Sequence, residues 1–78
     1  MNNEIIKSIR KKYNMTQREF AKVLNCSFAL IALVEVGKRR VTENLENKVK
    51  STFQIDDKQL EAITLSIKES SKGIQNYL

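Results

Sequence analysis

Apolar side chains recur at the start of the chain with the three- and four-residue spacing that places them on one face of a helix. The members of this stripe are Ile5, Ile6, Ile9 and Tyr13. Basic residues occupy positions 10–12, in the expected last turn, where they complement the negative end of the helix dipole. The pattern predicts a helix over residues 3–13.

A second helix is predicted by its start signal. Thr16 is suited to cap a helix, and Glu19, three residues later, is suited to bond back to the cap, so that the two form a capping box. Met15, just before the cap, is placed to pack on Phe20 as a hydrophobic staple. Asn25 tolerates the left-handed conformation in which many helices end, so we expect this helix to stop there.

Two further helices follow, each again with a capping residue. Ser27 precedes an apolar run that we expect to be helical up to Val36, with Gly37 as the helix stop. Thr42 is suited to cap the next helix. The apolar stripe of that helix consists of Leu45, Val49 and Phe53.

The last predicted helix is capped by Asp56, with Gln59 at its third position. Its apolar stripe consists of Leu60, Ile63 and Ile67. The residues that weaken any continuation are Ser70, Ser71 and Gly73. The second and third predicted helices are short and joined across Asn25 and Cys26, which makes them a helix-turn-helix candidate. We therefore predict a helix-turn-helix domain over residues 1–69 and a C-terminal tail over residues 70–78. We expect the apolar side chains of the tail either to dock on a neighbour or to fray; they are Ile74, Tyr77 and Leu78.

Charge is unevenly distributed along the chain. The 78 residues carry 14 basic and 9 acidic side chains, a net charge of +5. Eleven of the basic residues but only five of the acidic ones lie within the first 50 positions. Such a concentration of positive charge points to a polyanionic partner, most often nucleic acid, although a solvated lysine-rich surface would give the same count.

The composition is poor in groups that carry catalysis or bind metals. Histidine is absent and Cys26 is the only cysteine, so the chain lacks the commonest general base, an internal disulfide and a cysteine-rich zinc site. A chain of this size has little room for a catalytic cleft. We therefore expect no enzymatic activity, no small-molecule substrate, no cofactor and no metal. With neither a signal peptide nor a long apolar span, we expect a cytoplasmic protein without a membrane partner.

Two segments carry a family resemblance: residues 15–24 read MTQREFAKVL, and residues 35–39 read EVGKR. The first resembles the capped second helix of the Cro/C1-type (XRE) helix-turn-helix regulators, and the second resembles the end of their recognition helix. The resemblance covers nearly the whole predicted fold and implies an all-α, compact, five-helix lambda-repressor-like DNA-binding domain. It also implies a buried salt bridge between Arg10 and Glu35. Asn25 stands where the family usually has glycine in the turn.

The resemblance implies DNA contacts on both sides of the turn. Gln17 and Arg18, at the start of the second helix, are placed to hold a phosphate, and the basic run at positions 38–40 is placed to reach the flanking backbone. The recognition helix would enter the major groove and read base edges. The candidate DNA-binding residues are therefore Gln17, Arg18, Ser27, Phe28, Ala29, Leu30, Lys38, Arg39 and Arg40.

The recognition helix departs from the family pattern because its outward positions are apolar. From Phe28 to Val36 the only polar side chain is Glu35, which is expected to face Arg10. A helix that is apolar all round is usually covered all round. Three explanations stay open: contact with thymine methyl groups of an operator, docking on a partner repressor, or burial in a homodimer. The candidate protein-interface residues are Phe28, Ala29, Ala32, Leu33 and Val36.

These observations predict a small transcriptional regulator of a phage or bacterial genome. In the first hypothesis it binds double-stranded operator DNA through the second and third helices and the basic segment that follows them. In the alternative, it is an antirepressor-like modulator whose apolar helix binds a repressor protein and blocks the binding of that repressor to DNA.

Overall fold

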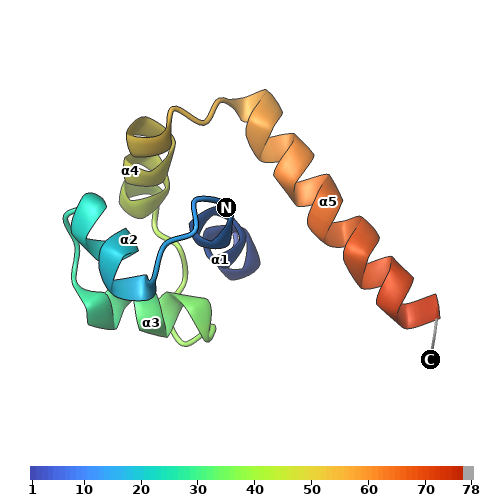
Figure 1. Ribbon diagram of the computed structural model, residues 1–78, viewed down its shortest axis with the longest axis horizontal. Coiled ribbons are helices and arrows are strands. Elements are labelled where there is room, and N and C mark those ends of the chain that lie inside the picture. Colours follow the sequence, from blue (N-terminus) through green and yellow to red (C-terminus); the bar gives the residue numbers. More distant parts are fainter. Residues whose placement is uncertain (77–78) are drawn as a thin grey trace.

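Five helices make up the described part of the chain (Figure 1). The structure is a computed structural model that describes the backbone of residues 1–76 and the side chains of residues 1–67. The helices are α1 (Asn3–Lys12), α2 (Gln17–Val23), α3 (Phe28–Glu35), α4 (Glu43–Phe53) and α5 (Asp57–Asn76). No strand occurs within residues 1–76, so the predicted all-α class is confirmed.

Four of the helices begin at the capping residues that the sequence predicts. These residues are Thr16, Ser27, Thr42 and Asp56. The capping box of α2 is complete, because Thr16 Oγ1 accepts the Glu19 N–H at 3.1 Å and Glu19 Oε1 accepts the Thr16 N–H at 2.9 Å. Asp56 and Gln59 form the same reciprocal pair at the start of α5. The cap of α1, Asn2, was not predicted.

Each connection among the first four helices, and the end of α4, contains one residue with positive φ. These residues are Asn14, Asn25, Gly37 and Gln54, with φ of 57°, 55°, 83° and 53°. Asn25 and Gly37 were predicted as helix stops, and α3 ends at Glu35, just before the expected Val36. Gln54 has no preference for this conformation. Its neighbours, half-buried Phe53 and buried Ile55, hold it there by packing into the core.

One hydrophobic core joins α1 to α4. The buried residues are Ile5, Ile6, Ile9, Phe20, Ala21, Leu24, Ile31, Val34, Leu45, Val49 and Ile55. Phe20 is fully buried and stacks on Phe53, with ring centroids 5.6 Å apart. Phe53 also stacks on Tyr13, which stays largely exposed because it lies at the C-cap of α1. Apart from Tyr13, the stripe residues predicted for the first, fourth and fifth helices are buried or half-buried in this single core.

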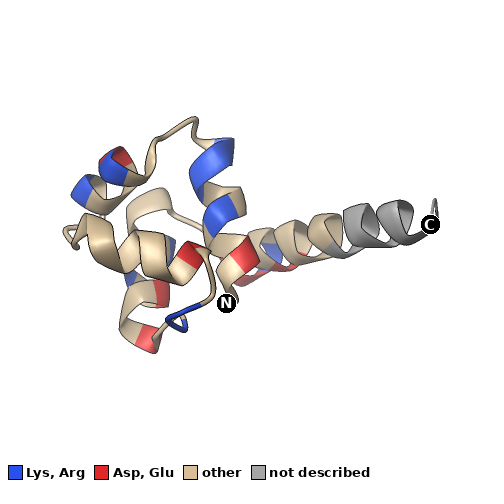
Figure 2. Cartoon of the chain, turned by 90° about the horizontal axis from the view of Figure 1, so that it is seen from below, with Lys and Arg blue, Asp and Glu red and all other residues tan. Residues whose placement is uncertain are grey.

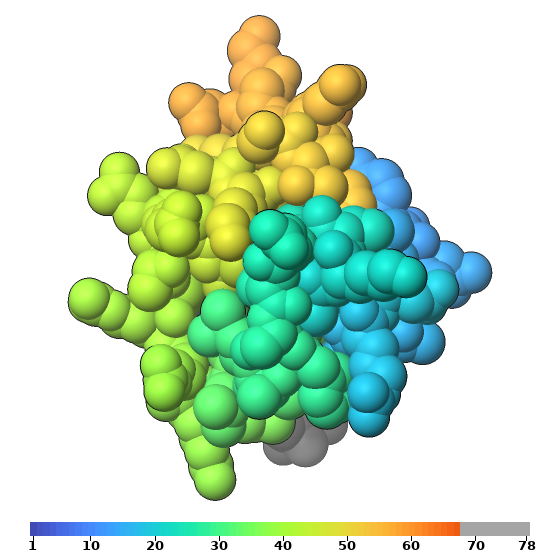
Figure 3. Space-filling view, turned by 90° about the vertical axis from the view of Figure 1, so that its left-hand side faces the viewer, coloured from blue at the N-terminus to red at the C-terminus, as the bar shows by residue number. Residues whose placement is uncertain are grey.

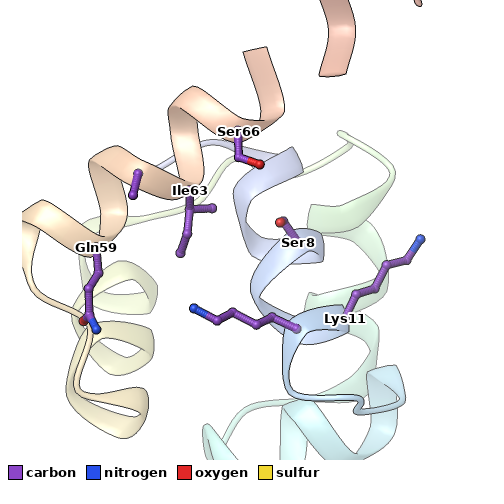
Figure 4. Close-up of a pocket in the computed structure, with 7 residues that line it drawn as sticks. Ser8, Lys11, Gln59, Ile63 and Ser66 are labelled. Carbon is purple, nitrogen blue, oxygen red and sulfur yellow. The ribbon is translucent and has the colours of Figure 1, made fainter. Parts of the chain in front are cut away.

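α1 lies between the α2–α3 pair and α5 (Figure 1). The predicted stripe of α5 is half-buried and packs against the core; its residues are Leu60, Ile63 and Ile67. An open groove of about 550 Å³ lies between α1 and α5 beside their contact (Figure 4). The residues that line it are Ser8, Lys11, Lys12, Gln59, Ala62, Ile63 and Ser66. The groove and the α2–α3 pair thus lie on different sides of α1.

α5 is the longest helix, and it extends further than expected. The residues expected to weaken its continuation were Ser70, Ser71 and Gly73, but the helix runs to Asn76. This expectation was wrong because serine and glycine each lower helix propensity by only about 1 kcal/mol or less. The domain boundary at residue 69 stays a prediction, and the expected docking of Tyr77, Leu78 and the Ile74 side chain lies outside the described residues. No helix in the described part of the chain combines the length and hydropathy needed to cross a membrane.

Candidate nucleic-acid interface

α2 and α3 form a helix-turn-helix with residues 24–27 as the turn. Asn25 adopts the left-handed conformation, and the Cys26 N–H donates to the Ala21 carbonyl at 3.0 Å, which brings the turn close to α2. The small Ala21 side chain is 3% exposed and permits this approach. Burial raises the pKa of the Cys26 thiol, so this residue is suited to packing rather than to reaction as a thiolate.

A buried ion pair ties the end of α3 to α1. Arg10 Nε lies 2.7 Å from Glu35 Oε2, and Arg10 Nη2 lies 3.0 Å from Glu35 Oε1, so the pair is bidentate. The Glu35 side chain is only 3% exposed and that of Arg10 14%. Arg10 Nη1 also donates to the Met15 carbonyl at 2.8 Å, which fixes the connection between α1 and α2. The structure therefore brings together the two residues that the resemblance implied as a salt bridge.

Gln17 also points toward this ion pair. Its Nε2 donates to Glu35 Oε1 at 3.2 Å, and its side chain is half-buried. The sequence suggested that Gln17 faces a phosphate. An amide nitrogen carries a second N–H, so a phosphate contact at the edge of the helix pair is compatible with the bond to Glu35. The hydrogen bond from Gln17 to Glu35 thus links the start of α2 to the end of α3.

Asn3 is a structural residue of this region that the sequence did not reveal. Its Nδ2 donates to the Val34 carbonyl at 2.6 Å and to the Arg39 carbonyl at 2.8 Å. These bonds connect the first turn of α1 to the end of α3 and to the basic segment. The two hydrogen bonds span 31 and 36 positions of the chain, so no local pattern could have predicted them.

Arg18 and Phe28 stack on each other across the helix-turn-helix. The guanidinium carbon of Arg18 lies 4.5 Å from the centre of the Phe28 ring. At an exposed site such a cation–π contact contributes about 0.5–1 kcal/mol. Phe28 is nevertheless 41% exposed. The structure thus places two of the predicted DNA-binding residues side by side, with a positive charge at the apolar start of α3.

The outer face of α3, which we define as residues 28, 29, 32 and 33 together with the C-cap residue 36, is apolar and partly open to solvent. Figure 3 shows part of α3, in green, at the surface of the molecule. Its exposed members are Phe28, Ala29 and Val36, and its half-buried members are Ala32 and Leu33. Val36 is 68% exposed. Leu30 was expected to point outward, but it is half-buried and packs against the core. The reason is that Leu30 lies one turn before buried Val34, on the edge of the inner stripe.

A hollow of about 320 Å³ opens beside this outer face. It is lined by Ser27, Ala29, Leu30, Leu33 and Arg39. The Leu33 carbonyl accepts the N–H of Lys38 at 2.9 Å and that of Arg39 at 3.3 Å, so the chain after α3 folds back over the helix end. Gly37, with φ of 83°, permits this reversal. The basic segment of residues 38–40 is thereby held at the rim of the outer face.

Exposed cations lie on α2 and on the segment that follows α3. Lys38, Arg39 and Arg40 are all exposed, as is Arg18 on α2. Lys and Arg also occur on other helices, and the acidic residues are interspersed with them (Figure 2). The α3 side therefore combines an apolar centre with exposed cations beside it.

Together, this fold and site define a helix-turn-helix domain of the DNA-binding type. The family model described as Helix-turn-helix matches residues 6–45, just over half of the chain, and the chain belongs to that family, the Cro/C1-type (XRE) helix-turn-helix proteins. The family is one of DNA-binding regulators. The matched segment includes the Arg10–Glu35 ion pair, the turn and the basic segment. No curated protein and no solved structure matches the chain.

Proposed function

We propose that this protein is a cytoplasmic transcriptional regulator of a phage or bacterial genome that binds operator DNA through α2, α3 and the basic segment of residues 38–40. The observation that carries the proposal is the outer face of α3, which is open to solvent and has exposed cations beside it. Family membership supports DNA as the polyanion. The protein acts by binding, without catalysis, cofactor or metal.

In this proposal the contacts divide into two kinds. Gln17, Arg18 and the basic segment contact phosphates and fix the orientation of the domain, because such contacts carry no sequence information. The start of α3 lies in the major groove and contributes the base contacts. The residues assigned to that second group are Ser27, Phe28, Ala29 and Leu30. A homodimer would bind a pseudo-palindromic site with half-sites about one helical turn apart.

The phosphate contacts are tested by replacing two cations of the basic segment. Arg39→Ala together with Arg40→Ala is expected to weaken binding to all duplexes and to flatten the plot of log K against log salt by about two units of slope. Fluorescence anisotropy over a salt series measures both effects. The matched control is Lys58→Ala, an exposed cation at the start of α5, which should leave the slope unchanged. An unaltered slope in the double variant contradicts the proposed contact.

A second candidate function is supported by the exposure of Phe28, Ala29 and Val36 on an apolar helix. An apolar patch of this kind is typical of protein interfaces. In this alternative the outer face of α3 docks on a partner repressor and blocks its DNA binding. The contacting residues would be Phe28, Ala29, Ala32, Leu33 and Val36.

The two functions are separated by a charge placed on the outer face. Val36→Asp should leave the fold intact because this side chain is 68% exposed. A repressor complex formed by the outer face should be lost in this variant, whereas Arg39→Ala with Arg40→Ala should retain it. The measurement is co-purification with the candidate repressor, with thermal melting as the control for folding. A complex that survives Val36→Asp contradicts docking through α3.

A further inference from the structure

We propose that α3 recognises the C5-methyl groups of pyrimidines in the major groove, thymine foremost, in place of base donors and acceptors. The inference rests on the proposed operator binding and specifies the chemistry of that site. It depends on three features that lie together: the lack of side chains on α3 that could pair with a base, the apolar wall of the hollow beside it, and the cation that lines the same hollow.

α3 offers no side chain suited to a bidentate hydrogen bond with a base. Glu35 is its only polar residue, and both of its carboxylate oxygens accept hydrogen bonds, from Arg10 and Gln17. The Glu35 side chain is only 3% exposed, so its carboxylate is not available to a base in the DNA major groove. The Ser27 hydroxyl oxygen accepts the Leu30 N–H at 3.1 Å as the helix cap, and its single O–H cannot form a bidentate bond with a base. Recognition of purines normally uses Arg, Lys, Asn or Gln on the reading helix, and α3 has none.

The hollow beside α3 offers an apolar wall against which a methyl group can pack. Ala29 and Leu33 lie one helical turn apart, and Leu30 completes an apolar wall between them. The C5-methyl of thymine is the only apolar group that a standard base pair presents in the major groove. 5-Methylcytosine carries a methyl group on the same ring carbon. The ligand that this wall fits is therefore a pyrimidine bearing a C5-methyl group.

Charge complementarity supports the same occupant. Arg39 lines the rim of the hollow, and the chain beside it is fixed by the hydrogen bond from the Arg39 N–H to the Leu33 carbonyl and by the bond from Asn3 to the Arg39 carbonyl. A nucleotide whose methyl group enters the hollow would have its phosphate toward a cation. A purely apolar peptide segment would gain nothing from that cation, whereas every nucleotide brings a phosphate, which is why DNA is the favoured occupant.

The expected strength of this recognition can be stated as a ratio. Removing one buried methyl group should weaken binding about fourfold, which corresponds to about 0.8 kcal/mol. Removing two methyl groups within the contacted site should weaken binding about 15-fold. Discrimination of this size is modest beside that of a bidentate hydrogen bond, so we expect a preference for thymine-rich sites rather than strict selection of one sequence.

The test begins with the full chain and a random pool of DNA duplexes, from which the bound sequences are selected. In a selected duplex, each thymine is then replaced by uracil, which removes the methyl group and keeps every hydrogen-bonding atom of the base. We expect a loss of about fourfold at each contacted thymine and none at thymines outside the footprint. Replacing a cytosine by 5-methylcytosine at a contacted position should raise the affinity.

Two variants separate methyl recognition from general affinity. Leu33→Ala, checked for folding by thermal melting, should lower the thymine-to-uracil preference and leave the salt slope unchanged. Arg39→Ala should weaken binding to the thymine duplex and to its uracil form by the same factor. A selected duplex whose fully uracil-substituted form binds within twofold of the original overturns methyl recognition while operator binding stands. A pool from which no duplex is bound above random DNA overturns operator binding and this inference together, and leaves docking on a protein as the function of the outer face.

Discussion

At the scale of single residues, Glu35 is the point at which three helices are joined. Its carboxylate accepts hydrogen bonds from Arg10 on α1 and Gln17 on α2 while it closes α3 itself. A buried carboxylate of this kind is costly unless all its partners are present. The orientation of α3 relative to α1 and α2 therefore depends on this one cluster more than on any exposed charge.

The ion pair yields a prediction about stability. Arg10→Met should lower the free energy of unfolding by about 3–5 kcal/mol, because it leaves the Glu35 charge buried with only the Gln17 amide beside it. Urea denaturation measures the loss. The double variant Arg10→Met with Glu35→Leu should recover most of it, since no charge is then buried. A single variant that loses less than about 1 kcal/mol would mean that the pair behaves like a surface salt bridge.

At the scale of secondary structure, the start of α2 depends on the capping box. The Thr16 N–H and hydroxyl, hydrogen-bonded to the Glu19 carboxylate, hold the pKa of that carboxyl below its ordinary value. The folded pKa thus lies below the unfolded one. The box therefore contributes stability that is fully present above the unfolded pKa and is lost as the pH falls through the folded pKa.

The capping box can be tested by titration. Thr16→Ala removes the hydroxyl and keeps the Thr16 N–H, the larger cause of the lowered pKa. The Glu19 pKa should therefore rise part of the way toward its ordinary value, and the acid-induced loss of stability assigned to this carboxyl should shrink. Carboxyl chemical shifts of Glu19 followed by NMR across the acidic range measure the shift. Thr42→Ala, which removes the cap of α4, is the matched control and should leave the Glu19 titration unchanged. An identical Glu19 midpoint in Thr16→Ala contradicts the contribution assigned to the hydroxyl.

At the scale of the whole molecule, α1 to α4 share one small core, so its stability is concentrated in few side chains. Phe20 is fully buried and lies in the stack with Phe53. A domain of this size has a total stability of only about 4–12 kcal/mol. Loss of one large buried side chain therefore affects the whole helix-turn-helix and not only α2.

The prediction at this scale compares two apolar residues of different burial. Phe20→Ala should cost about 3–5 kcal/mol and abolish cooperative melting or lower the melting temperature steeply. Leu65→Ala, at a position that is 52% exposed on α5, should change the stability by less than about 0.5 kcal/mol. Circular dichroism melting curves provide the comparison. Equal effects of the two substitutions would contradict a core centred on α1 to α4.

The sequence by itself determined the features that depend on near neighbours in the chain. The caps at Thr16, Ser27 and Thr42 and the stops at Asn25 and Gly37 were readable because a cap or a left-handed turn is formed by residues within a few positions of each other. The apolar stripes were readable for the same reason. The family resemblance added the Arg10–Glu35 pair, which the spacing of residues alone would not have given.

The tertiary structure decided whatever depends on helices that are distant in sequence. The bond from Gln17 to Glu35, the anchoring of the basic segment by Asn3, and the stacking of Arg18 on Phe28 arise only when α1, α2 and α3 pack together. The half-buried position of Leu30, which was expected to be exposed, likewise depends on where the core lies relative to α3. Local patterns fix which residues become helical, but the side that a helix leaves open is set by the other helices that cover the rest of it.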